Sequence, residues 1–222
     1  MLLFWFFSFN LWSAEIFKDS FTEGKAQLQW MFFPHYFLDN LEAVKDPTAP
    51  EGDRGIGILT NSKVGGFAAL SYAITPEVSD FYLEAMVYCP VSEGDKGPLV
   101  GLAFLIDPIE GRFYRFVCDF NKKSPSLNLA YVGKDTRHFP VYLKFWKETD
   151  ISNQFPKESG WQKMGLRVKK GKAIFYWNDR KLEGVLDVSR IKKGLVGIYT
   201  NFVGGLGKAE AKVDYFLLEI LK

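Results

Sequence analysis

The chain has 222 residues, of which 47% are hydrophobic and 17% aromatic, so it can bury a large core and extended disorder is not expected. Its 28 basic and 26 acidic residues leave a net charge of +2, and the lysines are scattered along the sequence. Nucleic-acid binding usually needs clustered positive charge, so we expect no nucleic-acid partner.

The first fourteen residues, MLLFWFFSFNLWSA, form an apolar run too short to cross a bilayer, which takes about 20 residues. An apolar segment from Leu2 to Leu11 is followed by the small residues Ser13 and Ala14, an order typical of a secretory signal peptide. The alternative is an N-terminal strand packed in the core. We therefore expect a signal peptide over residues 1–14, export to a periplasmic or extracellular location, and no membrane span in the mature chain.

Between the leader and residue 132 the sequence alternates short β-rich runs with turn residues. Strands are expected over residues 16–21, 57–61, 67–74, 81–89, 99–106, 112–120 and 127–132. The aromatic segment 30–41 contains Pro34 and favours a packed loop or a short irregular strand, and residues 45–54 favour a loop. The segment DPIEG at residues 107–111 is a strong hairpin signal.

The regular pattern stops between residues 134 and 159, in a segment that keeps a high density of aromatic residues. Loops of this length without structure are uncommon in compact domains, and they tend to be functional or to hold a short helix. Residues 141–147 could alternatively form a strand. We treat residues 134–159 as an insertion whose simplest role is a hydrophobic flap over one end of the domain.

The most informative stretch runs from Gly160 to Phe202. Met164, Leu166 and Val168 alternate with polar residues, as in a strand with one buried face. The segment KKGK at residues 169–172 then turns the chain into a second β-rich run over 173–177. Residues 178–180, NDR, begin with two that tolerate left-handed dihedrals, and GLVGIY at 194–199 completes the block with a further strand.

This order of a tryptophan, an amphipathic strand, a short turn, a strand ending in Asn-Asp and a Gly-hydrophobic-Gly strand resembles the C-terminal half of concanavalin A-like lectin/glucanase jelly rolls. The laminin-G-like modules and related secreted bacterial domains belong to that group. The resemblance covers residues 15–222. It implies an all-β fold, a single antiparallel β-sandwich with little helix, in which the first expected strand pairs with the last, over residues 213–221.

The chain contains only two cysteines, Cys89 and Cys118, which excludes a disulfide framework. In a simple up-and-down order, strand 99–106 separates the strands that carry them and puts their Cα atoms about 10 Å apart, beyond disulfide reach. We expect two free thiols, buried as small hydrophobic side chains. Two cysteines without a nearby histidine also make no zinc site.

Glycoside hydrolases of this architecture carry two carboxylates spaced Glu-x-Asp-x-x-Glu on one strand, and the sequence lacks that motif. It also lacks the Asn-Ser-Gly-Ile type segment expected in a related family that acts on 3-keto sugars. An enzyme would need two of Glu84, Asp107, Glu110 and Asp119 in one cleft, about 5 to 10 Å apart. The sequence therefore points to no catalytic residue and favours a protein that is not an enzyme.

The sequence gives more support to a binding face than to a catalytic site. Strand alternation groups polar side chains with tyrosines, and on the outer face of one curved sheet they would suit a sugar, whose hydroxyls need fixed donors and acceptors and whose C–H face packs on aromatic rings. The expected contacts are Tyr82, Glu84, Tyr88, Arg115, Asp119, Asn128 and Arg167, with His138 and Trp146 from the insertion. The alternative is cross-strand ion pairing on a solvated face, such as Glu84 with Arg115.

The leading hypothesis is an exported, non-catalytic carbohydrate- or glycan-binding module without a cofactor. The resemblance also makes calcium conceivable, with Asp107, Asp119, Asn121 and Asp135 as ligands, although the sequence has no compact Asp-x-Asp-x-Asp loop. The alternatives are a glycoside hydrolase-like enzyme and a structural protein-interaction domain. The last would be favoured if the insertion filled a flat sheet.

Overall fold

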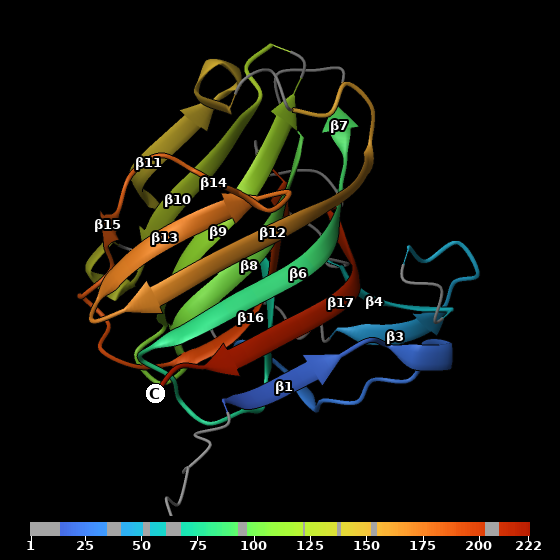
Figure 1. Ribbon diagram of the computed structural model, residues 1–222, viewed down its shortest axis with the longest axis horizontal. Coiled ribbons are helices and arrows are strands. Elements are labelled where there is room, and N and C mark those ends of the chain that lie inside the picture. Colours follow the sequence, from blue (N-terminus) through green and yellow to red (C-terminus); the bar gives the residue numbers. More distant parts are fainter. Residues whose placement is uncertain are drawn as a thin grey trace, which may run out of the picture.

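The computed structural model describes residues 14–34, 41–50, 54–60, 68–92, 97–121, 123–136, 139–151, 155–202 and 209–222. Two β-sheets pack face to face over the main hydrophobic core, with sheet A in front of sheet B in Figure 1. A second, smaller buried cluster, which includes Phe113 and Val117, lies on the outer face of sheet B. Neighbouring strands are antiparallel, except that the short β7 (Val91–Ser92) runs parallel to β9. All of the expected signal peptide except Ala14 lies outside the described residues. Within them, no helix is long and apolar enough to cross a membrane.

Sheet A follows the order β14-β13-β12-β6-β17-β4-β3, and β1 and β15 pair with β17 and β13. Its strands are β1 (Glu15–Asp19), β3 (Glu42–Lys45), β4 (Gly55–Thr60), β6 (Phe81–Cys89), β12 (Gly160–Lys169), β13 (Lys172–Trp177), β14 (Arg180–Lys181), β15 (Leu186–Asp187) and β17 (Glu210–Ile220). The pairing of β1 with β17 confirms the expected contact between the first and last strands.

Sheet B follows the order β11-β10-β9-β8-β16-β5-β2, and β7 lies beside β9. Its other strands are β2 (Trp30–Phe32), β5 (Ala69–Ala73), β8 (Pro98–Asp107), β9 (Arg112–Asn121), β10 (Ser126–Val132), β11 (Val141–Lys147) and β16 (Leu195–Phe202). Three 3-10 turns, η1 (Thr22–Gly24), η2 (Lys134–Thr136) and η3 (Glu148–Ile151), complete the described elements.

The core lies between the sheets and is built by alternate residues of the long strands. On β6 every second residue from Phe81 to Cys89 is fully buried, as the period of two predicts. Aromatic rings fill the centre, where Phe175 of β13 lies 4.9 Å from Phe116 of β9 and 5.3 Å from Trp146 of β11, between ring centroids. The expected antiparallel sandwich is therefore confirmed.

The turns of the 160–202 block also match the sequence. Lys170 and Gly171 have positive φ (51° and 70°) between β12 and β13, and Asn178 and Asp179 have positive φ (47° and 65°) between β13 and β14. Two consecutive residues in this region make the tight hairpin turns that suit the strand twist. The insertion is more regular than a flap, because residues 141–147 form the edge strand β11 of sheet B.

The predicted separation of the cysteines is wrong. Cys89 ends β6 in sheet A and Cys118 lies on β9 in sheet B, so the two strands face each other across the core instead of flanking β8 in one sheet. Both thiols are free and buried, as expected, but their Sγ atoms are only 2.9 Å apart.

Candidate functional site

The expected site residues lie on two opposite surfaces. Tyr82, Glu84, Tyr88 and Arg167 belong to β6 and β12 and lie on the outer face of sheet A. Three others belong to β9 and β10 and lie on the outer face of sheet B: Arg115, Asp119 and Asn128. The single polar strip across one sheet is therefore wrong, and so is an ion pair between Glu84 and Arg115, because the whole sandwich separates them.

On the outer face of sheet A, Glu84 is the centre of a network of hydrogen bonds and ion pairs. Its carboxylate accepts hydrogen bonds from the hydroxyls of Tyr82 and, at 2.5 Å, Tyr215 of the neighbouring strand. The Lys163 ammonium lies 3.6 Å away and also pairs with Asp179 at 3.0 Å. Because its neighbours already occupy the carboxylate, the network stabilises the outer face of sheet A and leaves Glu84 little capacity for a ligand.

We expect the fold to lose stability in alkaline solution. Burial, together with the hydrogen bond to Glu84, raises the pKa of Tyr82, and burial raises the pKa of Tyr114 to about 12 from its ordinary value of 10. The folded chain keeps these protons where the unfolded chain loses them, so the free energy of unfolding should fall as the pH rises above about 10. Urea denaturation at about pH 8 and about pH 11 measures the difference in the free energy of unfolding. A smaller difference in Tyr82→Phe would assign part of the loss to Tyr82. Equal stability at both pH values would contradict the expectation.

The outer face of sheet B holds a buried cation between two aromatic rings. Arg115 is 1% exposed, and its Nη1 donates to Tyr199 Oη at 2.7 Å and its Nη2 to Tyr142 Oη at 3.3 Å. The guanidinium carbon lies 5.0 Å from the ring centroid of Tyr199 and 5.7 Å from that of Tyr142. The cation–π contact with its ring and the hydrogen bond to its hydroxyl fix Tyr142, which belongs to the edge strand β11.

Two further polar side chains lie on the same face, beside Arg115. Asn128 is 2% exposed, and its Oδ1 has no hydrogen-bond partner among the residues that the structure describes, which is costly for a buried amide. Asp119 lies opposite Ser126 in the strand register and accepts a hydrogen bond from Asn121 Nδ2 at 3.2 Å. Burial raises the pKa of the Asp119 carboxyl, against the smaller lowering effects of Asn121 and the Arg115 charge.

Next to these residues, a cavity of about 560 Å³ opens along the edge formed by β9, β10 and β11; we call it the edge cavity. Its lining residues are Asp119, Lys123, Ser124, Pro125, Ser126, Phe145, Lys147 and Thr149. Phe145 is 45% exposed and stacks on Tyr142, with centroids 4.8 Å apart and planes 28° apart. The edge cavity thus combines a supported aromatic face with a carboxylate, hydroxyls and amines.

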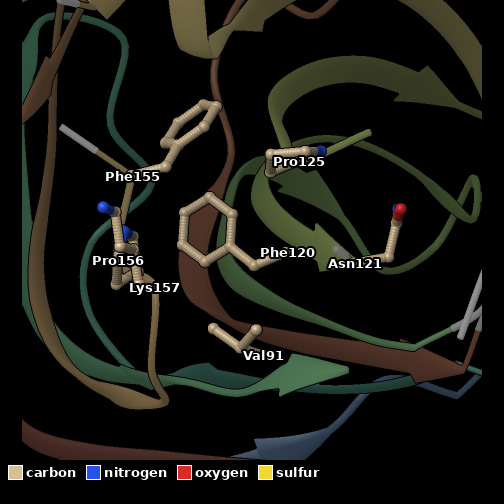
Figure 2. Close-up of a pocket in the computed structure, with 7 residues that line it drawn as sticks. All are labelled: Val91, Phe120, Asn121, Pro125, Phe155, Pro156 and Lys157. Carbon is tan, nitrogen blue, oxygen red and sulfur yellow. The ribbon is translucent and has the colours of Figure 1, made fainter. Parts of the chain in front are cut away.

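A smaller cavity of about 260 Å³, the end cavity, lies across Pro125 from the edge cavity and shares that residue with it. It is lined by Val91, Phe120, Asn121, Pro125, Phe155, Pro156 and Lys157 (Figure 2). The rings of Phe120 and Phe155 lie beside each other in Figure 2, with centroids 4.9 Å apart. Its walls are mostly apolar, and Asn121 and Lys157 are its polar members.

The carboxylates of the enzyme alternative are distributed over three places. Glu84 is on sheet A and Asp119 lines the edge cavity, whereas Asp107 and Glu110 line a third cavity, of about 580 Å³, at the turn between β8 and β9. There Asp107 forms an ion pair with Arg112 at 3.0 Å and accepts the backbone N–H of Glu110 at 3.0 Å. Asp107 and Glu110 do meet in one cleft, but Asp107 is engaged in holding the hairpin turn.

The insertion supplies two of the expected site residues, Trp146 and His138. Trp146 is fully buried, packs on Phe116 and donates Nε1 to Glu183 O at 2.9 Å, so it is a core residue and the prediction of a ligand contact is wrong. His138 lies outside the described residues. In the same segment, Phe145 lines the edge cavity and Tyr142 stacks on it. The aromatic density of the segment was the signal, but only the strand register shows which rings point outward.

The conceivable calcium ligands do not form one site. Asp119 and Asn121 lie at the end of β9, whereas Asp107 pairs with Arg112, the first residue of that strand. Asp135 accepts a hydrogen bond from Tyr131 near the end of β10. In the described part of the chain, no three His, Cys, Asp or Glu side chains gather as a metal site would require.

No protein-family model matches the sequence, and no curated protein matches it. Solved structures do. The chain is similar to the carbohydrate-binding module CBM66 from Bacillus subtilis, with a TM-score of 0.51 and 13% identity over 83% of this chain and 96% of that one. It is also similar to a glycoside hydrolase family 16 endo-glucanase from Bacteroides ovatus, with a TM-score of 0.54 and 14% identity over 90% and 98% of the two chains.

A third similar structure is the GlcNAcα1-4Gal-releasing endo-β-galactosidase from Clostridium perfringens. Its TM-score is 0.59 at 10% identity, over 93% of this chain and 62% of the enzyme. At these identities the likeness shows the fold, a concanavalin A-like jelly-roll sandwich. Because binding modules and hydrolases share this fold, the choice between them depends on the site.

Proposed function

We propose that this protein is an exported, non-catalytic glycan-binding module and that the edge cavity is its binding site. The observation that carries the proposal is the meeting of Phe145 with Asp119 and Ser126 at one cavity, where the Phe145 ring is supported by the stacked ring of Tyr142. The printed descriptions of similar structures, a carbohydrate-binding module and glycan-cleaving enzymes, support a sugar as ligand. Export follows from the expected signal peptide.

The chemistry of the cavity suits a sugar ring. Phe145 offers an open aromatic face, held in place by Tyr142, which the buried Arg115 fixes from below. The C–H face of a pyranose or furanose packs on such a ring, while its hydroxyls need acceptors and donors at the rim. Asp119 and Ser126 can accept hydrogen bonds from sugar hydroxyls, and Lys147 can donate hydrogen bonds to them.

The number of carboxylates at the edge cavity favours binding over catalysis. Glycoside hydrolysis by the common mechanisms needs two carboxyl groups about 5 to 10 Å apart across the scissile bond. Among the described residues that line the edge cavity, Asp119 is the only one with a carboxylate side chain. A glycan bound there would meet one carboxyl group among the described residues. One carboxyl group is enough to hold a sugar hydroxyl but not to carry out retaining or inverting hydrolysis.

The proposal predicts that Phe145→Ala weakens glycan binding about tenfold, because an aromatic stacking contact is worth roughly 1 to 1.5 kcal/mol. A glycan array with the purified protein identifies a ligand, and titration calorimetry on that ligand then compares the variants. Phe139→Ala is the matched control, since Phe139 is 73% exposed and does not line the edge cavity. It should bind like the unaltered protein.

Three outcomes would change the conclusion. Absence of binding to any glycan at millimolar concentration would reject the glycan-binding proposal and favour a protein-interaction domain. Equal losses in Phe145→Ala and Phe139→Ala would move the site away from the edge cavity. Cleavage of the bound glycan on prolonged incubation, seen by chromatography, would make the protein an enzyme.

A further inference from the structure

The two cysteines meet at the interface between the sheets. Cys89 is the last residue of β6 in sheet A, and Cys118 lies on β9 in sheet B. Their Sγ atoms are 2.9 Å apart, and both residues are at most 1% exposed. A disulfide has its sulfurs about 2.05 Å apart, so a side-chain adjustment of under about 1 Å would bring these two to bonding distance.

Within the described residues, the two thiols are not part of a metal site. The described residues gather no third His, Cys, Asp or Glu beside the thiols, as a metal site would require. Burial raises the pKa of the Cys89 thiol, and the neighbouring Cys118 raises it further. The thiolate is the reactive form, so Cys89 is a poor nucleophile once the core has closed, and burial keeps external disulfides away from both sulfurs.

We propose that Cys89 and Cys118 form a disulfide that joins the two sheets, made during folding by exchange with an external disulfide. One cysteine thiolate attacks the external disulfide, forms a mixed disulfide and releases one thiolate. The second cysteine, deprotonated, attacks the protein sulfur of the mixed disulfide and releases the other thiolate. The protein loses two electrons and two protons, and the external disulfide is reduced to two thiols.

The bond would act at the end of the sandwich that carries the end cavity and the edge cavity. Cys89 is two residues before Val91, and Cys118 is two residues before Phe120. Val91 and Phe120 pair with each other on the neighbouring strands β7 and β9, and both line the end cavity. Figure 2 shows the side chains of Val91 and Phe120 beside each other. A covalent link here would hold β6 and β9 together, close to the point where the chain leaves β6 of sheet A and enters β7, which pairs with β9.

The test is to refold the reduced, denatured protein in a buffer of oxidised and reduced glutathione, and separately with excess dithiothreitol. Each product is then denatured in N-ethylmaleimide and its intact mass measured. We expect no adduct after glutathione and two adducts after dithiothreitol. The oxidised protein should melt about 10 °C higher, because the bond closes a loop across a sequence separation of 29 residues.

Cys118→Ala is the control: it cannot form the bond, so its melting temperature should be the same after both treatments. The natively folded reduced protein, mixed with oxidised glutathione without denaturant, should stay reduced for hours, because burial blocks the exchange. Two adducts after glutathione refolding would overturn the proposal, as would equal melting temperatures of the oxidised and reduced proteins. Neither result bears on glycan binding, so the two proposals fail separately.

Discussion

Replacing Asp19 by alanine should lower the free energy of unfolding by about 4 kcal/mol, the largest loss of stability that we expect from a single substitution outside the hydrophobic core. Asp19 ends β1 and is 0% exposed. Its Oδ1 accepts the backbone N–H groups of Phe21 at 3.0 Å and Gln27 at 3.1 Å. Its Oδ2 accepts Leu28 N–H at 3.1 Å and Trp30 Nε1–H at 2.8 Å.

One carboxylate therefore satisfies four donors in the connection between sheet A and sheet B. Phe21 N–H also donates to Gln27 Oε1 at 3.0 Å, so removing the carboxylate takes the partner from the other three donors, those of Gln27, Leu28 and Trp30. The site is poorly reached by water, and each buried unpaired donor costs about 1 to 3 kcal/mol. Trp30 packs on Phe216 of β17 at 5.0 Å between centroids, so its release would also loosen the core beside the terminal strands.

Urea denaturation followed by circular dichroism measures the loss, and Asp46→Ala supplies the control. Asp46 also caps a turn, accepting Thr48 N–H at 2.8 Å, but it does so in solvent, and its removal should cost under about 1 kcal/mol. Asp19→Asn should fall between the two, because an amide keeps one acceptor and loses the other. A free energy of unfolding for Asp19→Ala within about 1 kcal/mol of that of the unaltered protein would contradict this role.

Asp19 also shows what the sequence could and could not predict. Alternation of apolar residues on Phe81–Cys89 and Gly160–Lys169 predicts strands and their buried faces, because side-chain direction in a strand has a fixed period. Residues that tolerate positive φ, such as Gly171 and Asn178, predict the turns. Three of the four donors to Asp19, however, come from a loop whose path no local pattern encodes, so Asp19 looks like an ordinary polar residue at a strand end.

The errors at the candidate site have the same origin. Alternation shows which residues of a strand share a face, but not which sheet the strand joins. The chain passes from sheet A to sheet B between Cys89 and Val100, and that passage both separates Glu84 from Arg115 and brings Cys89 against Cys118. Sheet assignment is a tertiary property, and the up-and-down order placed all these strands in one sheet.

Asp119→Asn should weaken glycan binding about 30-fold and at the same time make the fold slightly more stable. The binding loss is large because a hydrogen bond from a sugar hydroxyl to an ionised carboxylate contributes about 1.5 to 3 kcal/mol, more than one to a neutral amide. Asp119 is the carboxylate among the described residues of the edge cavity, so no described neighbour there can replace its charge.

The opposite sign of the stability effect comes from the raised pKa of Asp119. Burial is the main cause of that shift, which means that the folded chain holds the proton more tightly than the unfolded chain. The stability provided by the protonated form is lost as the pH rises through the folded pKa, so the ionised carboxylate weakens the fold at neutral pH. Asparagine does not ionise and can still accept the hydrogen bond from Asn121, so the melting temperature should rise by about 2 °C.

The pH dependence of binding separates this role from a merely structural one. If the ionised carboxylate holds the sugar, binding by the unaltered protein should weaken as the pH falls through the raised pKa of Asp119, while the weaker binding by Asp119→Asn should stay constant over the same range. Calorimetric titrations across the acidic range measure both profiles. Parallel profiles would show that Asp119 does not contact the glycan, and a variant that binds normally but no longer cleaves its ligand would assign Asp119 to catalysis instead.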